Sequence, residues 1–515
     1  MTTPGAAQSP PEVVPGPAGS TLKERAVRGV FWGIIQTVAV KGVNIGGQVL
    51  LAYLLTPAEF GAVSKVLTAG IFFGAFCIFG IYDVHVQQGR DARAFASDAF
   101  WATVLTSIAG GLGMWLSAPW VARWLGDPSL VGLLRALAVA SALFALRSAP
   151  WAVLMAELRF RGVAAIESGV NAMRMILSLL LAATGFGAAS MIWPHIPSNV
   201  ARLVLSWRLA EPRVAWRGPS RRVLSVIRTS WPMAAGSLLI CVTNWGDYLI
   251  LARLVDESAL GLYFWAFNMS QQAAQLLGSS IANVVFASAS QIRDDAERQL
   301  GAIVRALTVG SFVVMPIALA QVAMAAPMVN LVFPAKWHAG IPLVQVFGLA
   351  SAMFMLGTIG QSSLKAQGRF RAYFFNLAVS AVVFVVAVYV GTIWSGVLGA
   401  AMGVLVFNVV FLLGNLWLVT RGQKRLLPLL WEVAIVPMIA AVVAAAPAFI
   451  ASTLLPRGTW IDLGLLTVGG LSGAGIYFLL ARRWMPEPLR EVLSIVFAAR
   501  RRRGSIEQVA DVSVP

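Results

Sequence analysis

The feature that most constrains this chain is that its first half recurs in its second half. Four short segments reappear in the same order, 200 to 212 residues later. The pairs are 44–54 with 244–254, 140–146 with 350–356, 159–161 with 369–371, and 187–189 with 399–401. The first pair is identical at five of 11 positions. Short apolar strings can match by chance, but the Arg-Phe-Arg pair at 159 and 369 is polar. The pattern predicts two similar halves, as in many secondary transporters, where two lobes move around a site between them.

The composition is that of an all-α integral membrane protein. Hydrophobic residues make up 58% of the chain and charged residues 12%, whereas soluble domains average about 25% charged residues. Because a membrane helix needs about 20 apolar residues, the sequence predicts fourteen spans. They lie near 29–55, 62–82, 98–120, 130–153, 163–184, 187–209, 230–254, 261–288, 303–326, 341–363, 372–391, 396–419, 428–451 and 461–481.

The positive residues predict the orientation of these spans. With both termini in the cytoplasm, 30 of the 39 Lys and Arg residues fall in inside segments and six in outside segments, as the positive-inside rule requires. The net charge of +17 is then explained by topology, and we expect no nucleic-acid partner. The remaining three cations lie inside predicted spans.

An even number of predicted spans separates the two copies, so both halves should point the same way across the membrane as a parallel repeat. Two C-terminal spans have no counterpart. The predicted domains are a disordered cytoplasmic tail at 1–21, an N-terminal six-span lobe at 22–210, a cytoplasmic linker at 211–229, a C-terminal six-span lobe at 230–420, the two extra spans at 421–484, and a basic cytoplasmic tail at 485–515.

The chain lacks the usual marks of an enzyme. It has no phosphate-binding Gly-x4-Gly-Lys-Ser/Thr loop and no Gly-x-Ser-x-Gly elbow, since 470–474 fails at its last position. His85, His195 and His338 are too far apart in sequence for a metal motif. The outside loops are too short to hold a glycan-joining site. The sequence therefore predicts a carrier, with no enzymatic activity, metal or cofactor.

Several motifs resemble one known family. The exit of the first span, 51–61, is similar to the Leu-Leu-Thr-Pro-x-x-Phe-Gly signature of the polysaccharide-transporter branch of the multidrug/oligosaccharidyl-lipid/polysaccharide exporter superfamily. Further resemblances occur at 126–128, 157–161, 244–254, 259–263 and 333–337. The resemblance implies a flippase for lipopolysaccharide, O-antigen or exopolysaccharide in the bacterial inner membrane. It implies a substrate carried on undecaprenyl diphosphate. The chain departs from the pattern at 193–197, where two prolines should interrupt the sixth span.

Three cations inside N-terminal spans are the candidate substrate-binding residues. Lys41, Arg174 and Arg202 lie in the first, fifth and sixth predicted spans. Each charge costs about 2.5–3.5 kcal/mol on insertion scales and usually faces a cavity or a partner. A basic cavity suits the diphosphate that the resemblance implies. The alternatives are snorkelling towards the membrane surface and internal ion pairs.

Asp247 is, by this interpretation, the one carboxylate well inside a span. It could pair with Lys41 across the lobe interface, bind H+ or Na+, or act locally near Arg253. The repeat-equivalent residues Asn44 and Asn244 could line the cavity or bridge helices.

The sequence thus predicts a flippase that moves a lipid-linked oligosaccharide by alternating access. Its other expected partners are membrane lipids and the proteins that polymerise or assemble the polysaccharide. A drug/cation antiporter of the same superfamily is the first alternative and would need an acidic cavity. A flippase for peptidoglycan precursors is a closer one. A glycan polymerase or ligase, or a purely structural protein, accounts for less of the sequence.

Overall fold

The computed structural model describes residues 42–87, 92–157, 159–212, 214, 222–271, 296–420, 426–456 and 458–494. Every regular element in these ranges is a helix. The predicted tail at 1–21 and Lys41 lie outside the described residues, as do residues 213 and 215–221 of the predicted linker and residues 495–515.

The N-terminal half of the described chain, 42–214, is built of helices joined by short turns. They are Gly42–Leu54, α2 (Pro57–Ile78), α3 (Ile81–Gln87), α4 (Ala92–Trp124), η2 (Pro128–Leu130), α5 (Val131–Leu146), α6 (Ser148–Ala156), α7 (Phe160–Ala183), α8 (Ala189–Ile192) and α9 (His195–Ala210).

The C-terminal half of the described chain, 222–494, is likewise built of helices. They are α10 (Arg222–Leu254), a helix at 257–271, α12 (Ala296–Val332), η3 (Ala335–Gly340), α13 (Ile341–Ala366), α14 (Phe370–Thr420), α15 (Leu426–Leu430), the π-helical turn η4 (Trp431–Ile435), α16 (Val436–Leu454), α17 (Thr459–Gly464), the π-helical turn η5 (Leu465–Gly469), α18 (Gly470–Trp484) and a helix at 486–494.

The all-helical membrane fold is confirmed. In the described ranges, ten helices are long and apolar enough to cross a bilayer, and Gly42–Leu54 is a shorter apolar helix. Every predicted span overlaps a helix. The 51-residue α14 covers two predicted spans, and it is interrupted where the sequence places their boundary, by non-helical backbone at Ser395 and Gly396. Helix α10 begins at Arg222, inside the predicted linker.

Matched hydrogen bonds in the two halves support the duplication. The Asn199 side chain donates to the carbonyl of Ala140, and Asn408, 209 residues later, donates to that of Ala350. The guanidinium of Arg159 donates to the Leu209 carbonyl. Its counterpart Arg369 in the same way donates to Leu418. Each contact ties a polar side chain to a backbone carbonyl of another segment, which is what two copies of one lobe would produce.

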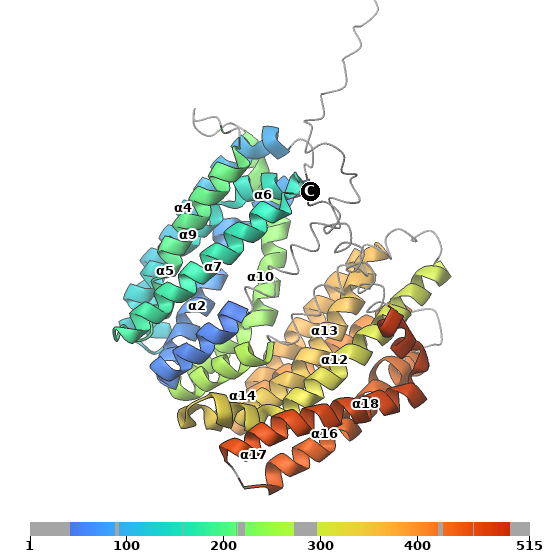
Figure 1. Ribbon diagram of the computed structural model, residues 1–515. Helices are drawn as coiled ribbons and strands as arrows, with labels where there is room; N and C mark the ends of the chain where they lie inside the picture. The colour runs from blue at the N-terminus through green and yellow to red at the C-terminus, as the bar shows by residue number, and fades with distance from the viewer. Residues whose placement is uncertain are drawn as a thin grey trace, which may run out of the picture.

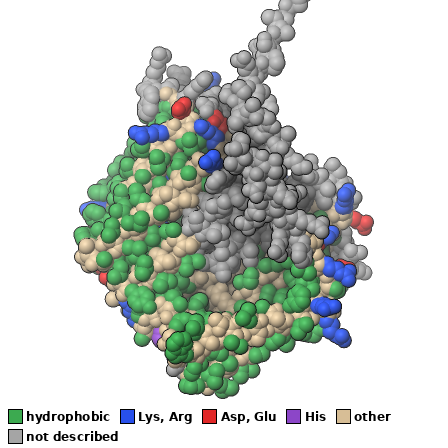
Figure 2. Space-filling view, in the orientation of Figure 1, with side chains coloured by type: hydrophobic (Ala, Val, Ile, Leu, Met, Phe, Trp, Pro, Cys, Tyr) green, Lys and Arg blue, Asp and Glu red, His purple; other side chains and the backbone are tan. Residues whose placement is uncertain are grey.

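The two halves converge at one end of the molecule (Figure 1). The blue-to-green N-terminal helices and the light-green-to-red C-terminal helices meet near α2, α10 and α14, below the level of the label C. One apolar core crosses this junction and includes Leu51, Phe60, Tyr248, Trp265 and Trp337, each at most 2% exposed. The flanks of both halves carry a largely hydrophobic surface (Figure 2), as expected for helices that face lipid.

Candidate functional site

A cavity with a volume of about 640 Å³ lies between the two halves of the described chain. Its wall is apolar with a small number of polar groups, which is the usual composition of a ligand site. The polar lining residues are Gln48, Ser141, Asn171, Arg174, His195, Asn199, Arg202, Ser237 and Asn268.

The charge of this wall comes from one side. Arg174 on α7 and Arg202 on α9 both line the cavity, so the structure brings together two of the three predicted cations. The C-terminal half supplies Ser237, Cys241 and Asn268 with two aromatic rings, none of them charged. The described wall is therefore basic on the N-terminal side and neutral on the other.

A break in the sixth predicted span places His195 at the cavity. Helix α8 ends at Ile192 and α9 begins at His195, with Trp193 and Pro194 in the turn between them. The predicted proline interruption is confirmed. The first turn of α9 therefore lies at the cavity wall, and the positive end of its helix dipole adds to the basic character of this side.

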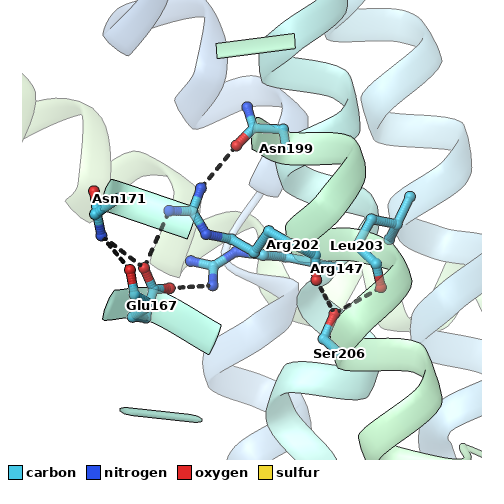
Figure 3. Close-up of polar contacts among 7 residues, drawn as sticks. All are labelled: Arg147, Glu167, Asn171, Asn199, Arg202, Leu203 and Ser206. Carbon is cyan, nitrogen blue, oxygen red and sulfur yellow. Dashed lines mark hydrogen bonds and ion pairs between the residues drawn. The ribbon is translucent and has the colours of Figure 1, made fainter. Parts of the chain in front are cut away.

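Arg202 is held in a buried network (Figure 3). Its Nη1 donates to Asn199 Oδ1 at 2.8 Å, and its Nη2 pairs with Glu167 Oε2 at 3.1 Å. The residue is 8% exposed, and its Nε has no hydrogen-bond partner among the described residues. Of the alternatives considered for Arg202, the structure therefore contains the internal ion pair, which is formed with Glu167.

Arg147 shares the same carboxylate. Its Nη1 lies 2.9 Å from Glu167 Oε1, and its guanidinium carbon lies 4.2 Å from the Phe144 ring centroid and 4.3 Å from that of Trp151. Ring contacts of this kind stabilise a desolvated cation. Glu167 thus bridges two arginines that come from the end of α5 and from α9 (Figure 3).

Arg174 is different from both neighbours. It lines the cavity, but it forms no hydrogen bond and no ion pair within the described part of the chain. No described carboxylate neutralises it. An anionic ligand in the cavity would find in Arg174 a cation whose five donors are all free.

Asp247 occupies a separate site inside the C-terminal half. The carboxylate is 2% exposed; Tyr263 donates to its Oδ2 at 2.7 Å, and its Oδ1 has no described partner. It lines a small cavity of about 30 Å³ together with Asn244 and Asn408. The predicted pairing with Lys41 is untested, because Lys41 lies outside the described residues.

The two repeat-equivalent asparagines occupy different environments. Asn244 donates to the Ile240 carbonyl and lines the small cavity beside Asp247. Asn44 is half-buried, and its Oδ1 is buried without a described partner. Neither is among the residues that line the large cavity.

Sequence reasoning missed Glu167 and Arg147, which the structure places beside Arg202. A signal was present. Glu167, Asn171 and Arg174 are spaced i, i+4, i+7, which places them on one face of α7. Asn199 and Arg202 are spaced i, i+3 on α9. Polar residues at helical spacing in an apolar span indicate a buried polar face.

Comparison with known proteins gives consistent results. A succinoglycan biosynthesis transport protein, ExoT of Rhizobium meliloti (strain 1021), is 24% identical over 397 residues, 77% of this chain and 80% of the relative. The lipopolysaccharide biosynthesis protein WzxC of Escherichia coli (strain K12) is 22% identical, over 76% of this chain and 80% of the relative.

Among solved structures, the lipid II flippase MurJ in an inward closed conformation has the same fold, with a TM-score of 0.72 at 14% identity over 88% of this chain and 99% of MurJ. A multidrug transporter of the MATE family in an inward-facing conformation has a TM-score of 0.54 at 16% identity, over 78% of this chain and 95% of its own. The family described as polysaccharide biosynthesis protein matches residues 50–342, more than half of the chain. The chain therefore belongs to the polysaccharide biosynthesis protein family, as its motifs indicated.

Proposed function

We propose that this protein is a flippase that moves an oligosaccharide linked to undecaprenyl diphosphate across the bacterial inner membrane for polysaccharide synthesis. The observation that carries the proposal is the cavity between the two halves, with Arg174 and Arg202 on its wall. Arginine binds phosphate oxygens through charge-assisted and often bidentate hydrogen bonds. The names of ExoT and WzxC, which refer to succinoglycan transport and lipopolysaccharide biosynthesis, support the same substrate class.

The arrangement of the halves supports alternating access. The turns where the halves converge, near Thr56 and Pro334, belong to segments that the charge distribution assigns to the outer side. In this state the outer ends are in contact. The diphosphate and sugars would enter the cavity from the cytoplasm while the prenyl chain stays in lipid, and separation of the outer ends would release them. Membrane lipids and proteins that polymerise or assemble the polysaccharide are the other proposed partners.

The alternatives differ in how well they fit the cavity. A drug/cation antiporter of the same superfamily needs acidic groups on the wall, whereas the charged groups on the described wall are arginines. A flippase for peptidoglycan precursors shares the diphosphate chemistry and differs only in the sugar. A polymerase or ligase would need a catalytic group at the glycan, and the proposed role of this chain is that of a carrier without enzymatic activity.

The proposal is tested in a bacterial host that lacks its own polysaccharide flippase and makes a matched lipid-linked oligosaccharide. We expect the wild-type chain to restore surface polysaccharide and to deplete the precursor in the cytoplasmic leaflet. Protein in the membrane is quantified by immunoblot. Persistence of the precursor inside, at normal protein level, would reject the flippase and favour the antiporter, which is then tested by drug efflux.

Asp247 distinguishes two proposals for the C-terminal half. If it pairs with Lys41, the single variants Lys41→Asp and Asp247→Lys should each lose transport, and the double variant should regain part of it. If it binds Na+ or H+, the double variant stays inactive, and Asp247→Asn should remove the dependence of transport on the ion gradient. Transport of labelled lipid-linked oligosaccharide in proteoliposomes, with and without a gradient, measures both.

A further inference from the structure

Glu167 holds two of the arginines but does not lie on the cavity wall. Its Oε1 pairs with Arg147 at 2.9 Å and its Oε2 with Arg202 at 3.1 Å, so both carboxylate oxygens are engaged with a guanidinium (Figure 3). Asn171, one turn later on α7, donates to the backbone carbonyl of Glu167 at 2.8 Å and lies 3.4 Å from its Oε2. The side chain is 20% exposed. These contacts fix the carboxylate behind the arginines.

The arginines around this carboxylate have unequal freedom. Arg147 is enclosed by two aromatic rings and by Glu167. Arg202 has one buried donor, Nε, without a partner, and Arg174 has no partner among the described residues. Three guanidinium groups and one carboxylate give this cluster a net charge of +2, carried towards the cavity by Arg174 and Arg202.

We propose that Glu167 limits the positive charge of the cavity to about that of a diphosphate diester, so that the carrier can release its ligand as well as bind it. The inference rests on the proposed function and deepens it, because it assigns control of the ligand affinity to a residue that does not line the cavity. A diphosphate diester carries two negative charges and a phosphate diester carries one. Positive charge in excess of the ligand's negative charge would strengthen the binding of either anion.

A carrier must also release its ligand. Removing Glu167 would leave three arginines to face two negative charges, which would raise the affinity for any anion and slow its release. A variant without Glu167 would therefore bind its ligand more tightly but transport it more slowly. This is the signature that separates the proposal from a merely structural role of Glu167, in which binding and transport would decline together.

The test uses purified full-length protein in detergent and two soluble probes. One is a short prenyl chain joined to N-acetylglucosamine through a diphosphate, and the other is the same molecule with a single phosphate. We expect the wild type to bind the diphosphate probe more tightly. Glu167→Gln should tighten the binding of both probes by about tenfold, since it removes an opposing charge near the ligand. In the cellular assay the same variant should transport less at normal protein level.

Two further variants isolate the cause. Glu167→Asp keeps the charge, so its affinity should stay within about threefold of the wild type. Glu157→Gln removes a partly exposed carboxylate beside Arg159 at the end of α6, outside the cavity, and should change neither binding nor transport. If Glu167→Gln binds the diphosphate probe as the wild type does, or more weakly, in folded protein, the inference is overturned. If the wild type itself binds neither probe, the failure is that of the proposed function.

Discussion

Arg174→Gln is expected to reduce transport of the lipid-linked oligosaccharide by about tenfold or more while the protein remains in the membrane at its normal level. The reason is the unusual state of Arg174, which lines the cavity without any described partner. Its replacement breaks no ion pair, so the fold should not suffer. A hydrogen bond to a charged group contributes about 1.5–3 kcal/mol, and its loss from the bound complex corresponds to about a tenfold to hundredfold loss of affinity.

Surface polysaccharide and precursor in the cytoplasmic leaflet are the measurements. Arg174→Lys keeps a charge but loses the planar fork of donors, and it should transport at an intermediate rate. Arg123→Gln is the matched control. This residue lies at the end of α4 and bonds to the Pro119 carbonyl, away from the cavity. Normal transport by Arg174→Gln would show that the cation is structural and that the substrate binds elsewhere.

The helices could be predicted from the sequence because the length of an apolar run is set by the bilayer itself. The same physics placed the break inside α14, where Ser395 and Gly396 leave the helical region. The break before α9 followed from two prolines. Boundaries were less accurate: α10 begins at Arg222, within a basic segment that hydropathy assigns to a loop.

The site could be predicted only in part because its contacts join distant segments. Arg174 and Arg202 stood out as charges in apolar runs. Glu167 and Arg147 did not, since Arg147 lies at the end of α5 and looks like one more cytoplasmic cation. Only the approach of α5, α7 and α9 brings these groups together. Asp247 was likewise predicted only in part. Its position in an apolar run indicates burial, but its hydrogen bond with Tyr263 depends on the packing of two helices.

The second large effect is expected where the two halves meet, at the end that we propose faces the outer side. The helix Gly42–Leu54 ends in carbonyl groups that no residue of its own helix can pair with. Residues of the C-terminal half satisfy them: Trp337 Nε1 donates to Ala52 at 2.8 Å, and Lys336 Nζ donates to Leu55 at 2.7 Å. The positive charge also suits the negative end of that helix. Lys65 and Glu257, 2.6 Å apart, form an ion pair between the halves.

Two repeat-equivalent glycines make this contact possible. A Cβ on Gly61 would overlap the backbone carbonyl of Glu257, and a Cβ on Gly261 would overlap that of Pro57. The two contacts are reciprocal, because Pro57 and Gly61 correspond to Glu257 and Gly261 at an offset of 200 residues. Helix α2 and the helix at 257–271 therefore cross with their backbones in contact, and small residues permit such crossings in membranes.

Gly261→Val is accordingly expected to prevent closure of the outer end and to lower transport by about tenfold or more, since an overlap with rigid backbone costs about 1–3 kcal/mol or more. The state with separated outer ends does not need the contact, so the variant should accumulate there. The distance between spin labels on the exposed residues Trp124 and Leu254, measured in the purified protein, should shift towards longer values.

Gly132→Val is the matched control, because a Cβ at that position of α5 meets no atom within 4 Å. It should leave both transport and the label distances unchanged. The expectation for Gly261 fails if its variant transports normally, or if it loses transport while the distance distribution stays that of the wild type. In the second case Gly261 would be needed only for the packing of the folded protein and not for opening and closure. A lengthened distance with lost transport would instead identify the crossing of the two helices as the contact that must form and break in every cycle.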